Sequence, residues 1–410
     1  MPPLLRYGTG HSVHLEVSDE ALVAHCGVPS AAVVNDVKNA LSEALNNPLE
    51  YPPLGRVVTP GDRIVLALDP DLPQMSEIVA GVVECLVQSG VDPDGLSILR
   101  SAPEAGIDEE DPFRLLSAEL RERIELVVHD SEHRDGLAYL AASATGEPIL
   151  VARALHEADL VLPIGCLQSA TAAGYYGIHS GWFPRFSDAA ACRRFRSPSS
   201  LDSQKGLKKQ LAKELHEVAW LLGLTFTIQV VPGPGDGILH VLAGEIGAVE
   251  RRGRELYDQA WQCTLPRQAQ LVVAAMEGAA TRQNWRHLGR ALEAAASLVE
   301  EGGAIAVCSE LAGAPGPAVQ RLVGAPSRKS AMREIRKDRP EDTLPAAQLV
   351  RALDRENVYL LSRLEPSLVE DLEMTPVAND AELIRLARRC RSCIVLSGAP
   401  HVCATLAPYE

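Results

Sequence analysis

The segment 172–188, AAGYYGIHSGWFPRFSD, combines side chains that together suit a ligand site. It carries five aromatic rings in a chain with only eight Tyr, four Trp and five Phe, and it adds His179 and Arg185. Rings form pocket walls, an imidazole titrates near neutral pH, and a guanidinium holds an anion. We therefore expect His179 to be a catalytic acid or base. The substrate-binding candidates of this segment are Tyr175, Tyr176, Trp182 and Arg185.

The alternative for this segment is structural. The same rings would fill a hydrophobic core, and His179 would then be a satisfied structural residue. The polar tips on most of the rings, together with Arg185, favour the pocket.

Other candidates follow predicted strands. Asp69 ends the apolar run DRIVLALD (62–69), and His129 ends IELVVHD (124–130). Ligands of open α/β sheets bind at the carboxyl ends of strands, so we expect both residues to line a substrate site. Asp69 and Asp71 share one loop, where paired carboxylates are more often turn formers than an acid pair.

Two further candidates lie near the helical pattern that starts at about residue 284. His287 is the second predicted catalytic residue, and Arg290 is a predicted substrate-binding residue. A racemase needs acid/base groups on both faces of the reacting carbon, and two histidines from opposite domains would supply them.

Two stretches have spacings that resemble metal sites. HDSEH (129–133) has the H-x-x-E-H spelling of a zinc protease, but it directly follows a predicted strand, whereas that motif needs both histidines on one helix face. The stretch 390–403 places Cys390, Cys393, His401 and Cys403 close together. An apolar strand separates its halves, which disfavours a zinc site. The sequence does not decide whether a metal binds there, and we predict none.

The elements that must position these residues follow an α/β pattern. Apolar runs of four to seven residues alternate with helical periodicity, which is typical of largely parallel sheets. A Gly/Pro/Asp cluster between the β-rich runs of 225–244 predicts a hairpin. A second set of α/β units follows residue 268. We place the boundary near 262–268, which gives an N-terminal domain, 1–264, and a C-terminal domain, 265–410.

Composition and charge exclude several classes of partner. The net charge of -15 argues against nucleic acid and against an anionic membrane surface. No apolar run approaches the roughly 18 residues that a membrane span needs. The start of the chain lacks the pattern of a signal peptide, and nine cysteines fit reduced thiols, so we expect a cytoplasmic protein. The sequence leaves a homo-oligomer open.

The order of several segments resembles that of the lactate racemase family, whose members use a nickel-pincer nucleotide bound to a lysine. The segments span about residues 40–310: ALNNPLEYPPL with VTPGDRIVLALDPDLP, the stretch 127–165, AAGYYGIHSGWFP, FTIQVVPGPGDGILHVLAGE, and ALEAAASLVEEGGAIAVCSE. The resemblance implies two α/β domains with mostly parallel sheets that flank an active-site cleft.

The family's catalytic positions are altered in this chain. Leu72 stands where the family has the arginine that holds the substrate carboxylate, and Ala105 stands where it has an acid/base histidine. Ser180 aligns with the lysine that carries the cofactor, and Ala170 with a nickel-ligating histidine. A later cofactor-contacting histidine falls near Arg196.

These changes remove the chemistry that the cofactor needs. A serine hydroxyl cannot form the lysine's linkage, and alanine offers nickel no lone pair. Leucine cannot make the bidentate contact of an arginine with a carboxylate. We therefore expect no nickel-pincer nucleotide.

Two functions remain open. The first is a racemase- or epimerase-type isomerase that binds a small anionic hydroxy acid or sugar acid in the interdomain cleft. The second is a catalytically inactive ligand-binding or scaffold homologue. The sequence identifies neither the substrate nor whether the chain is an enzyme.

Overall fold

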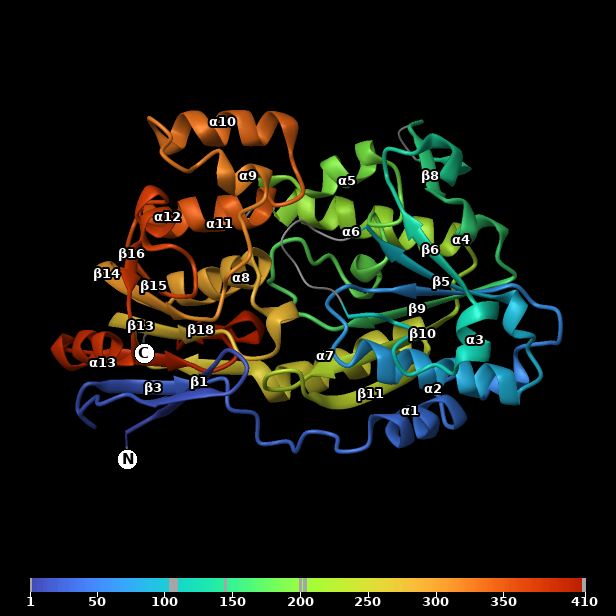
Figure 1. The fold of residues 1–410 in the computed structure, drawn as a ribbon, viewed down its shortest axis with the longest axis horizontal. Coiled ribbons are helices and arrows are strands. Elements are labelled where there is room, and N and C mark those ends of the chain that lie inside the picture. Colours follow the sequence, from blue (N-terminus) through green and yellow to red (C-terminus); the bar gives the residue numbers. More distant parts are fainter. Residues whose placement is uncertain (1, 103–109, 144–145, 199–200, 202–204, 408–410) are drawn as a thin grey trace.

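Two six-stranded sheets, one in each lobe, organise the computed structural model, which describes residues 2–102, 110–143, 146–198, 201 and 205–407 (Figure 1). Ala105 lies outside these residues. The first sheet has the order β11-β10-β9-β4-β5-β6. Its strands are β4 (Ile64–Leu68), β5 (Leu96–Ser101), β6 (Glu125–His129), β9 (Leu160–Cys166), β10 (Phe226–Pro232) and β11 (Ile238–Glu245).

The first sheet is parallel except at one edge. β10 and β11 form the predicted antiparallel hairpin, and the other pairs run parallel. All five residues of β4, IVLAL, are buried, as expected for a strand covered on both faces. The helices of this lobe are α1 (Val37–Asn46), α2 (Met75–Gln88), α3 (Ala118–Arg123), α4 (Arg153–Glu157), α5 (Ala189–Phe195), α6 (Lys205–Leu221) and α7 (Ile246–Trp261).

The second sheet has the order β16-β15-β14-β13-β17-β3, and every pair of strands in it is parallel. Its strands are β3 (Leu22–Cys26), β13 (Ala269–Ala275), β14 (Val299–Cys308), β15 (Asn357–Leu361), β16 (Thr375–Val377) and β17 (Cys393–Leu396). The helices are α8 (Trp285–Ala296), α9 (Pro317–Gln320), α10 (Arg328–Asp338), α11 (Thr343–Leu353), α12 (Pro366–Asp371) and α13 (Asp380–Arg389). The mostly parallel sheets confirm the predicted α/β class.

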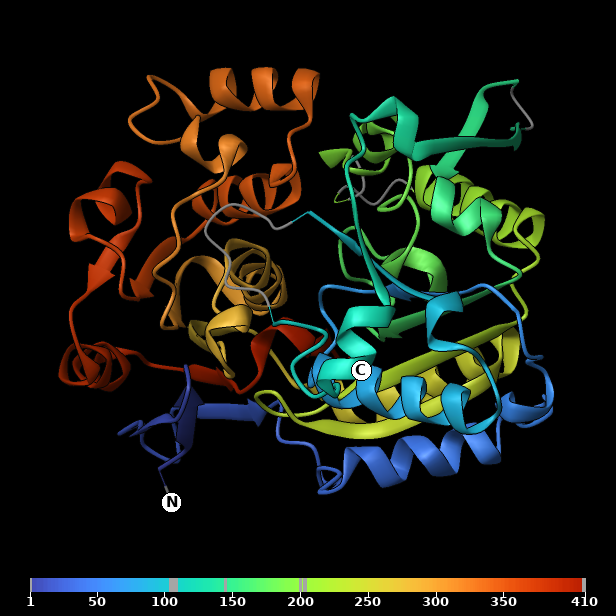
Figure 2. The same ribbon diagram turned by 45° about the vertical axis from the view of Figure 1, so that its right-hand side comes forward.

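The N-terminal segment packs in the second lobe rather than the first. β3 pairs with β17, and the hairpin of β1 (Leu4–Tyr7) and β2 (His11–His14) shares a hydrophobic cluster with β13 and β17. Figures 1 and 2 both show these blue strands beside the red C-terminal elements. The sequence prediction had placed this segment in the domain 1–264, so the first lobe effectively begins after β3.

Two further short pairings complete the fold. The predicted linker holds β12 (Gln262–Leu265), which pairs in parallel with β18 (Cys403–Leu406). β7 (Leu137–Ala142) and β8 (Pro148–Ala152) form a separate antiparallel pair. Within the described part of the chain, every helix is too short or too polar to cross a membrane.

Candidate functional site

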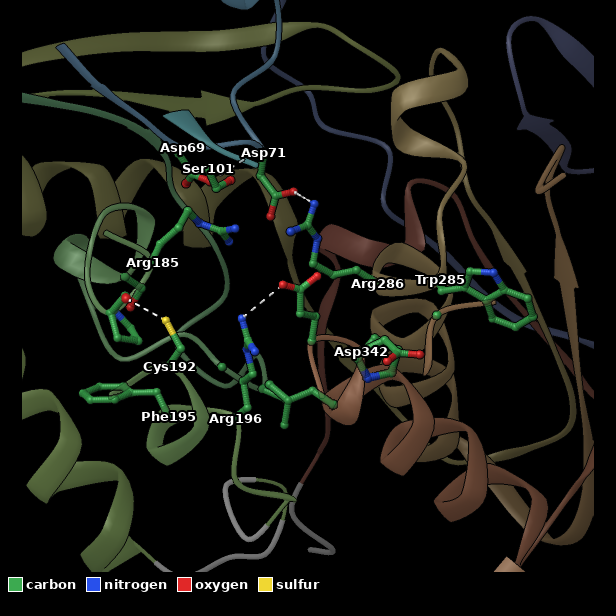
Figure 3. Close-up of a pocket in the computed structure, with 18 of the residues that line it drawn as sticks. Asp69, Asp71, Ser101, Arg185, Cys192, Phe195, Arg196, Trp285, Arg286 and Asp342 are labelled. Atoms are coloured by element: carbon green, nitrogen blue, oxygen red, sulfur yellow. Dashed lines mark hydrogen bonds and ion pairs between the residues drawn. The ribbon is translucent and has the colours of Figure 1, made fainter. Parts of the chain in front are cut away.

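A cavity of about 260 Å³ lies between the two lobes (Figure 3). The first lobe contributes the loops that follow β4, β5, β6 and β9, and the second contributes α8 and residues between 316 and 348. The polar and charged lining residues are Asp69, Asp71, Ser101, His129, Asp130, Ser131, Gln168, Tyr176, Ser180, Arg185, Cys192, Arg196, Trp285, Arg286, Arg290, Glu341, Asp342 and Gln348. The pocket therefore sits at the carboxyl ends of strands in the first sheet, where α/β proteins bind ligands.

Asp69 is a buried carboxyl at the end of β4. Its Oδ1 accepts a hydrogen bond from the backbone N–H of Asp71 at 3.0 Å, and its Oδ2 accepts one from Cys166 N at 3.4 Å. Burial, and then the charge of Asp71, raise the pKa of Asp69. A Cβ at Gly181 would lie 2.8 Å from Asp69 Oδ2, so only glycine lets the segment 172–188 pass this close.

Asp71, in the first lobe, contacts arginines of the second lobe and so joins the two lobes. Arg286 Nη2 lies 3.0 Å from Asp71 Oδ1, and Arg290 Nη2 donates to Oδ2 at 2.9 Å. Arg282, in the turn before α8, donates to the backbone carbonyl of Asp71 at 2.8 Å, and Gln168 Nε2 donates to Oδ2 at 3.2 Å. We call these five residues the Asp71 cluster.

The Asp71 cluster keeps its central carboxylate ionised. Burial alone would raise the pKa of Asp71, but the guanidinium groups of Arg286 and Arg290 outweigh it and hold that pKa well below its usual value. Arg286 and Arg290 are four residues apart on α8, so they share one helix face. Asn284 caps this helix by accepting the N–H of His287 at 2.9 Å, which fixes where that face points.

Two more arginines reach the pocket from the first lobe. Arg185 belongs to the segment 172–188, and its charge opposes the rise in the pKa of Asp69. Arg196 follows α5, and its Nη2 lies 3.9 Å from Glu341 Oε1 of the second lobe. In Figure 3 the guanidinium groups of Arg185, Arg196 and Arg286 point toward the same space.

The aromatic rings of the segment 172–188 mostly fill the protein interior. Tyr176 lines the pocket, but its hydroxyl donates to the backbone carbonyl of Phe195 at 2.9 Å. Trp182 is 1% exposed in the core of the first lobe, and Tyr175 is also buried. Tyr175 and Trp182 are not among the described residues that line the pocket. These two rings therefore fill the protein interior, as the structural alternative expects.

The structure does not bring the two predicted catalytic histidines to the pocket. His179 is buried, and its Nδ1 accepts a hydrogen bond from Trp182 Nε1 at 3.2 Å; burial, and then the charge of His216, lower the pKa of His179 to about 4. His287 is 2% exposed, its Nδ1 lies 2.9 Å from Asn284 Oδ1, and burial lowers its pKa well below the usual value. Neither residue lines the cavity in the part of the chain that the structure describes.

His129, Asp69, Arg185 and Arg290 do lie together at the cavity. The His129 Nε2–H donates to the carbonyl oxygen of Ser187 at 2.8 Å, which assigns the second nitrogen, Nδ1, as the acceptor of the neutral ring. Burial lowers the pKa of His129, and the bond to Ser187 opposes that change. The net effect of these surroundings favours the neutral ring of His129.

The positions that matched the family's cofactor site have other contacts here. Ser180 Oγ accepts the N–H of Tyr176 at 2.8 Å, and Leu72 is buried in the hydrophobic core. Ala170 is exposed, and its carbonyl accepts a hydrogen bond from Lys208 Nζ at 2.7 Å. Over the described residues, no lysine lines the pocket and no three His, Cys, Asp or Glu side chains gather as a metal site. The residues present do not fit a lysine-bound nickel nucleotide.

The sequence analysis missed several pocket residues, and one pattern would have revealed some of them. Arg286 and Arg290 are four residues apart, which places them on one face of a helix, and Arg282 lies four residues before Arg286. The spacing from Arg290 would therefore have predicted Arg286 as a neighbour of Arg290 in the site. Cys192, Asp342 and Gln348 lie on helices or turns whose sequences carry no comparable signal.

The fold and the pocket define a class: a two-lobed α/β protein with an arginine-rich pocket between parallel-stranded lobes. Residues 7–205 match the family model described as the lactate racemase N-terminal domain. Residues 7–205 are therefore similar to the lactate racemase N-terminal domain, which agrees with the resemblance seen in the sequence.

Solved structures share the fold of the whole chain. The lactate racemase apoprotein from Thermoanaerobacterium thermosaccharolyticum is 17% identical, with a TM-score of 0.77 over 99% of this chain and 100% of that one. A crystal structure of a protein from Thermotoga maritima is 12% identical, with a TM-score of 0.68 over 92% of this chain and 100% of that one. No curated protein is significantly similar in sequence.

Proposed function

We propose that the protein is a lactate-racemase-like isomerase that binds a small anionic hydroxy acid or sugar acid in the pocket between its lobes. One observation carries the proposal: Arg185, Arg196, Arg286 and Arg290 line the same cavity. Arginine is the side chain best suited to hold a carboxylate, because its planar fork donates two parallel hydrogen bonds. The cavity of about 260 Å³ lies below the roughly 300–1,000 Å³ typical of sites for drug-sized ligands, which suits a small acid.

The Asp71 cluster prepares the second lobe's arginines for binding. Asp71 holds both Arg286 and Arg290 at hydrogen-bond distance, and Gln168 supports the same carboxylate. Side chains fixed before binding lose less conformational entropy when the ligand arrives. Asp71 thus acts as a positioning residue for the anion-binding arginines.

Proton transfer in this proposal falls to Asp69 and His129 instead of His179 and His287. Both Asp69 and His129 line the cavity; Asp69 directly follows β4, and His129 is the last residue of β6. A carboxyl with a raised pKa and a neutral imidazole are effective acid/base groups near neutral pH. One would take the proton from the α-carbon and the other would return one to the opposite face, while arginines stabilise the enediolate formed between the two steps.

The proposal includes no nickel-pincer nucleotide. It rests on the residues at the corresponding positions: Ser180 offers a hydroxyl that is bonded to Tyr176 N, and Ala170 offers no side-chain ligand. We derive no step through that cofactor.

A second candidate is a catalytically inactive protein that binds the same acid. The burial of His179 and His287 outside the pocket favours it, because the two expected acid/base groups do not meet a ligand there. The two candidates share the binding site and differ only in proton transfer.

Deuterium exchange separates them. The purified chain is first screened for binding against both enantiomers of short hydroxy acids and against sugar acids. A bound acid is then incubated with the protein in D₂O and its α-hydrogen is followed by NMR. Exchange that is lost in Asp69→Asn and His129→Gln supports the isomerase, binding without exchange supports the second candidate, and no binding by any acid contradicts both.

Nickel is tested on the same protein. The chain is produced together with enzymes that make the nickel-pincer nucleotide, and its intact mass and nickel content are measured. We expect the mass of the bare polypeptide. A stoichiometric adduct with nickel would contradict the cofactor-free site.

A further inference from the structure

A pair of cysteines lies where α13 ends and β17 begins. The sequence there is RRCRSC, residues 388–393, so Cys390 and Cys393 have the C-x-x-C spacing of redox-active thiols. Cys390 is the residue at the C-terminal cap of α13, and Cys393 is the first residue of β17. The proposed function does not use either residue.

The two thiols face each other. Their side chains are hydrogen-bonded to one another, and Cys390 Sγ also lies 2.9 Å from the carbonyl oxygen of Ala387. Cys393 is fully buried, whereas Cys390 is only partly buried. One thiol of the pair is therefore open to solvent and the other is shielded behind it.

The nearby His401 and Cys403 do not join this pair. The His401 ring packs against Trp261 with 5.0 Å between ring centroids, and Cys403 Sγ lies 3.8 Å from Thr171 Oγ1. In the described part of the chain, these residues form no group of three metal ligands. The stretch 390–403 is thus better explained by a dithiol than by a metal site.

The contact between the two thiols favours the thiolate of Cys390 over that of Cys393. The hydrogen bond from Cys393 lowers the pKa of Cys390, although burial opposes it. The same hydrogen bond and burial raise the pKa of Cys393, which keeps that thiol protonated until Cys390 has reacted.

We propose that Cys390 and Cys393 form a reversible dithiol–disulfide pair, in which Cys390 reacts with low-molecular-weight disulfides and Cys393 resolves the adduct. The Cys390 thiolate attacks one sulfur of oxidised glutathione, forms a mixed disulfide and releases one glutathione thiolate. Cys393 then attacks Cys390 Sγ, its proton passes to the departing glutathione sulfur, and the second glutathione is released. Two electrons pass from the protein thiols to the small disulfide, and the protein loses two hydrogen atoms.

The site is independent of the ligand pocket. Cys393 pairs with Leu271 of β13 and Leu22 of β3 at the start of its strand, and the described lining of the pocket includes neither cysteine. Failure of the proposed isomerase function would therefore leave this inference standing, and the reverse also holds.

Peptide mapping of the natural chain tests the proposal. The reduced protein is equilibrated with buffers of increasing oxidised-to-reduced glutathione ratio, free thiols are alkylated, and the protein is digested with trypsin. Cleavage after Arg389 and Arg391 separates Cys390 from Cys393, so the two peptides stay joined only through a disulfide. The peptide with Cys393 also carries Cys403, which we expect to be alkylated and which serves as an internal control.

The expected result is a Cys390–Cys393 disulfide that appears and disappears reversibly with the glutathione ratio. Cys393→Ser should instead accumulate one glutathione on Cys390, and Cys390→Ser should leave Cys393 free to alkylate. Cys26→Ser is the matched control, because Cys26 is hydrogen-bonded to Cys263 in a similar pair; it should not change the mapping. Full alkylation of both Cys390 and Cys393 at every ratio, or a different pairing, would overturn the proposal.

Discussion

Replacing Asp71 by asparagine tests the contact that joins the lobes. The change keeps the shape of the side chain but removes the charge that Arg286 and Arg290 share. The Asp71 side chain is 5% exposed, and those of Arg286 and Arg290 are 19% and 12% exposed, so solvent screens these pairs little. Removing one partner of a buried ion pair costs about 3–5 kcal/mol, because the remaining charges stay buried. We expect Asp71→Asn to lower the free energy of unfolding by about 3 kcal/mol.

Urea unfolding, followed by fluorescence and circular dichroism, measures this loss. Glu255→Gln is the matched control: it removes an exposed ion pair with Arg252, which contributes about 0.5 kcal/mol or less. The pH dependence gives a second check. The pKa of Asp71 is depressed in the folded state, so its contribution is complete above about pH 4 and is lost as the pH falls through its folded value. An Asp71→Asn protein as stable as the control variant at neutral pH would refute the role given to the cluster.

Two further predictions concern the segment 172–188. Gly181→Ala should lower the free energy of unfolding by about 1–3 kcal/mol, because its Cβ would lie 2.8 Å from Asp69 Oδ2. Thermal unfolding measures this loss. Gly206→Ala is the control, because a Cβ at that position meets no atom within 4 Å. His179→Gln should reduce the loss of stability between about pH 6.5 and pH 4, because the unfolded natural chain takes up a proton in this range that the folded His179, with a pKa of about 4, does not. Urea titrations at several pH values measure the slope, and an unchanged slope would contradict the burial of this ring.

Much of the fold follows from local patterns in the sequence. The apolar runs that predicted strands at 62–69, 96–100, 124–130 and 158–165 correspond to β4, β5, β6 and β9, since a strand buried on both faces must be apolar throughout. The partner of β3 could not be predicted this way. Its pairing with β17 joins residues far apart in the sequence, and no local pattern specifies such a contact.

The site was predictable in outline and not in its details. Strand ends located Asp69 and His129, because the carboxyl ends of parallel strands meet at one edge. His179 and Trp182 lie in a short turn whose direction depends on packing, so their burial against each other was not visible in the sequence. Arg286 was detectable from its spacing to Arg290, but its partner Asp71 lies in the other lobe.

The central claim is that the arginines between the lobes bind a small organic acid. Titration calorimetry of the natural chain, Arg185→Met and the control Arg251→Met, whose arginine forms an exposed pair with Glu50, tests it most directly. A charge-assisted hydrogen bond contributes about 1.5–3 kcal/mol, and each 1.4 kcal/mol is tenfold in affinity. We predict that Arg185→Met weakens binding of the acid at least about tenfold, while Arg251→Met binds as the natural chain does. Equal affinity in all three proteins, or no binding in any, would contradict the claim.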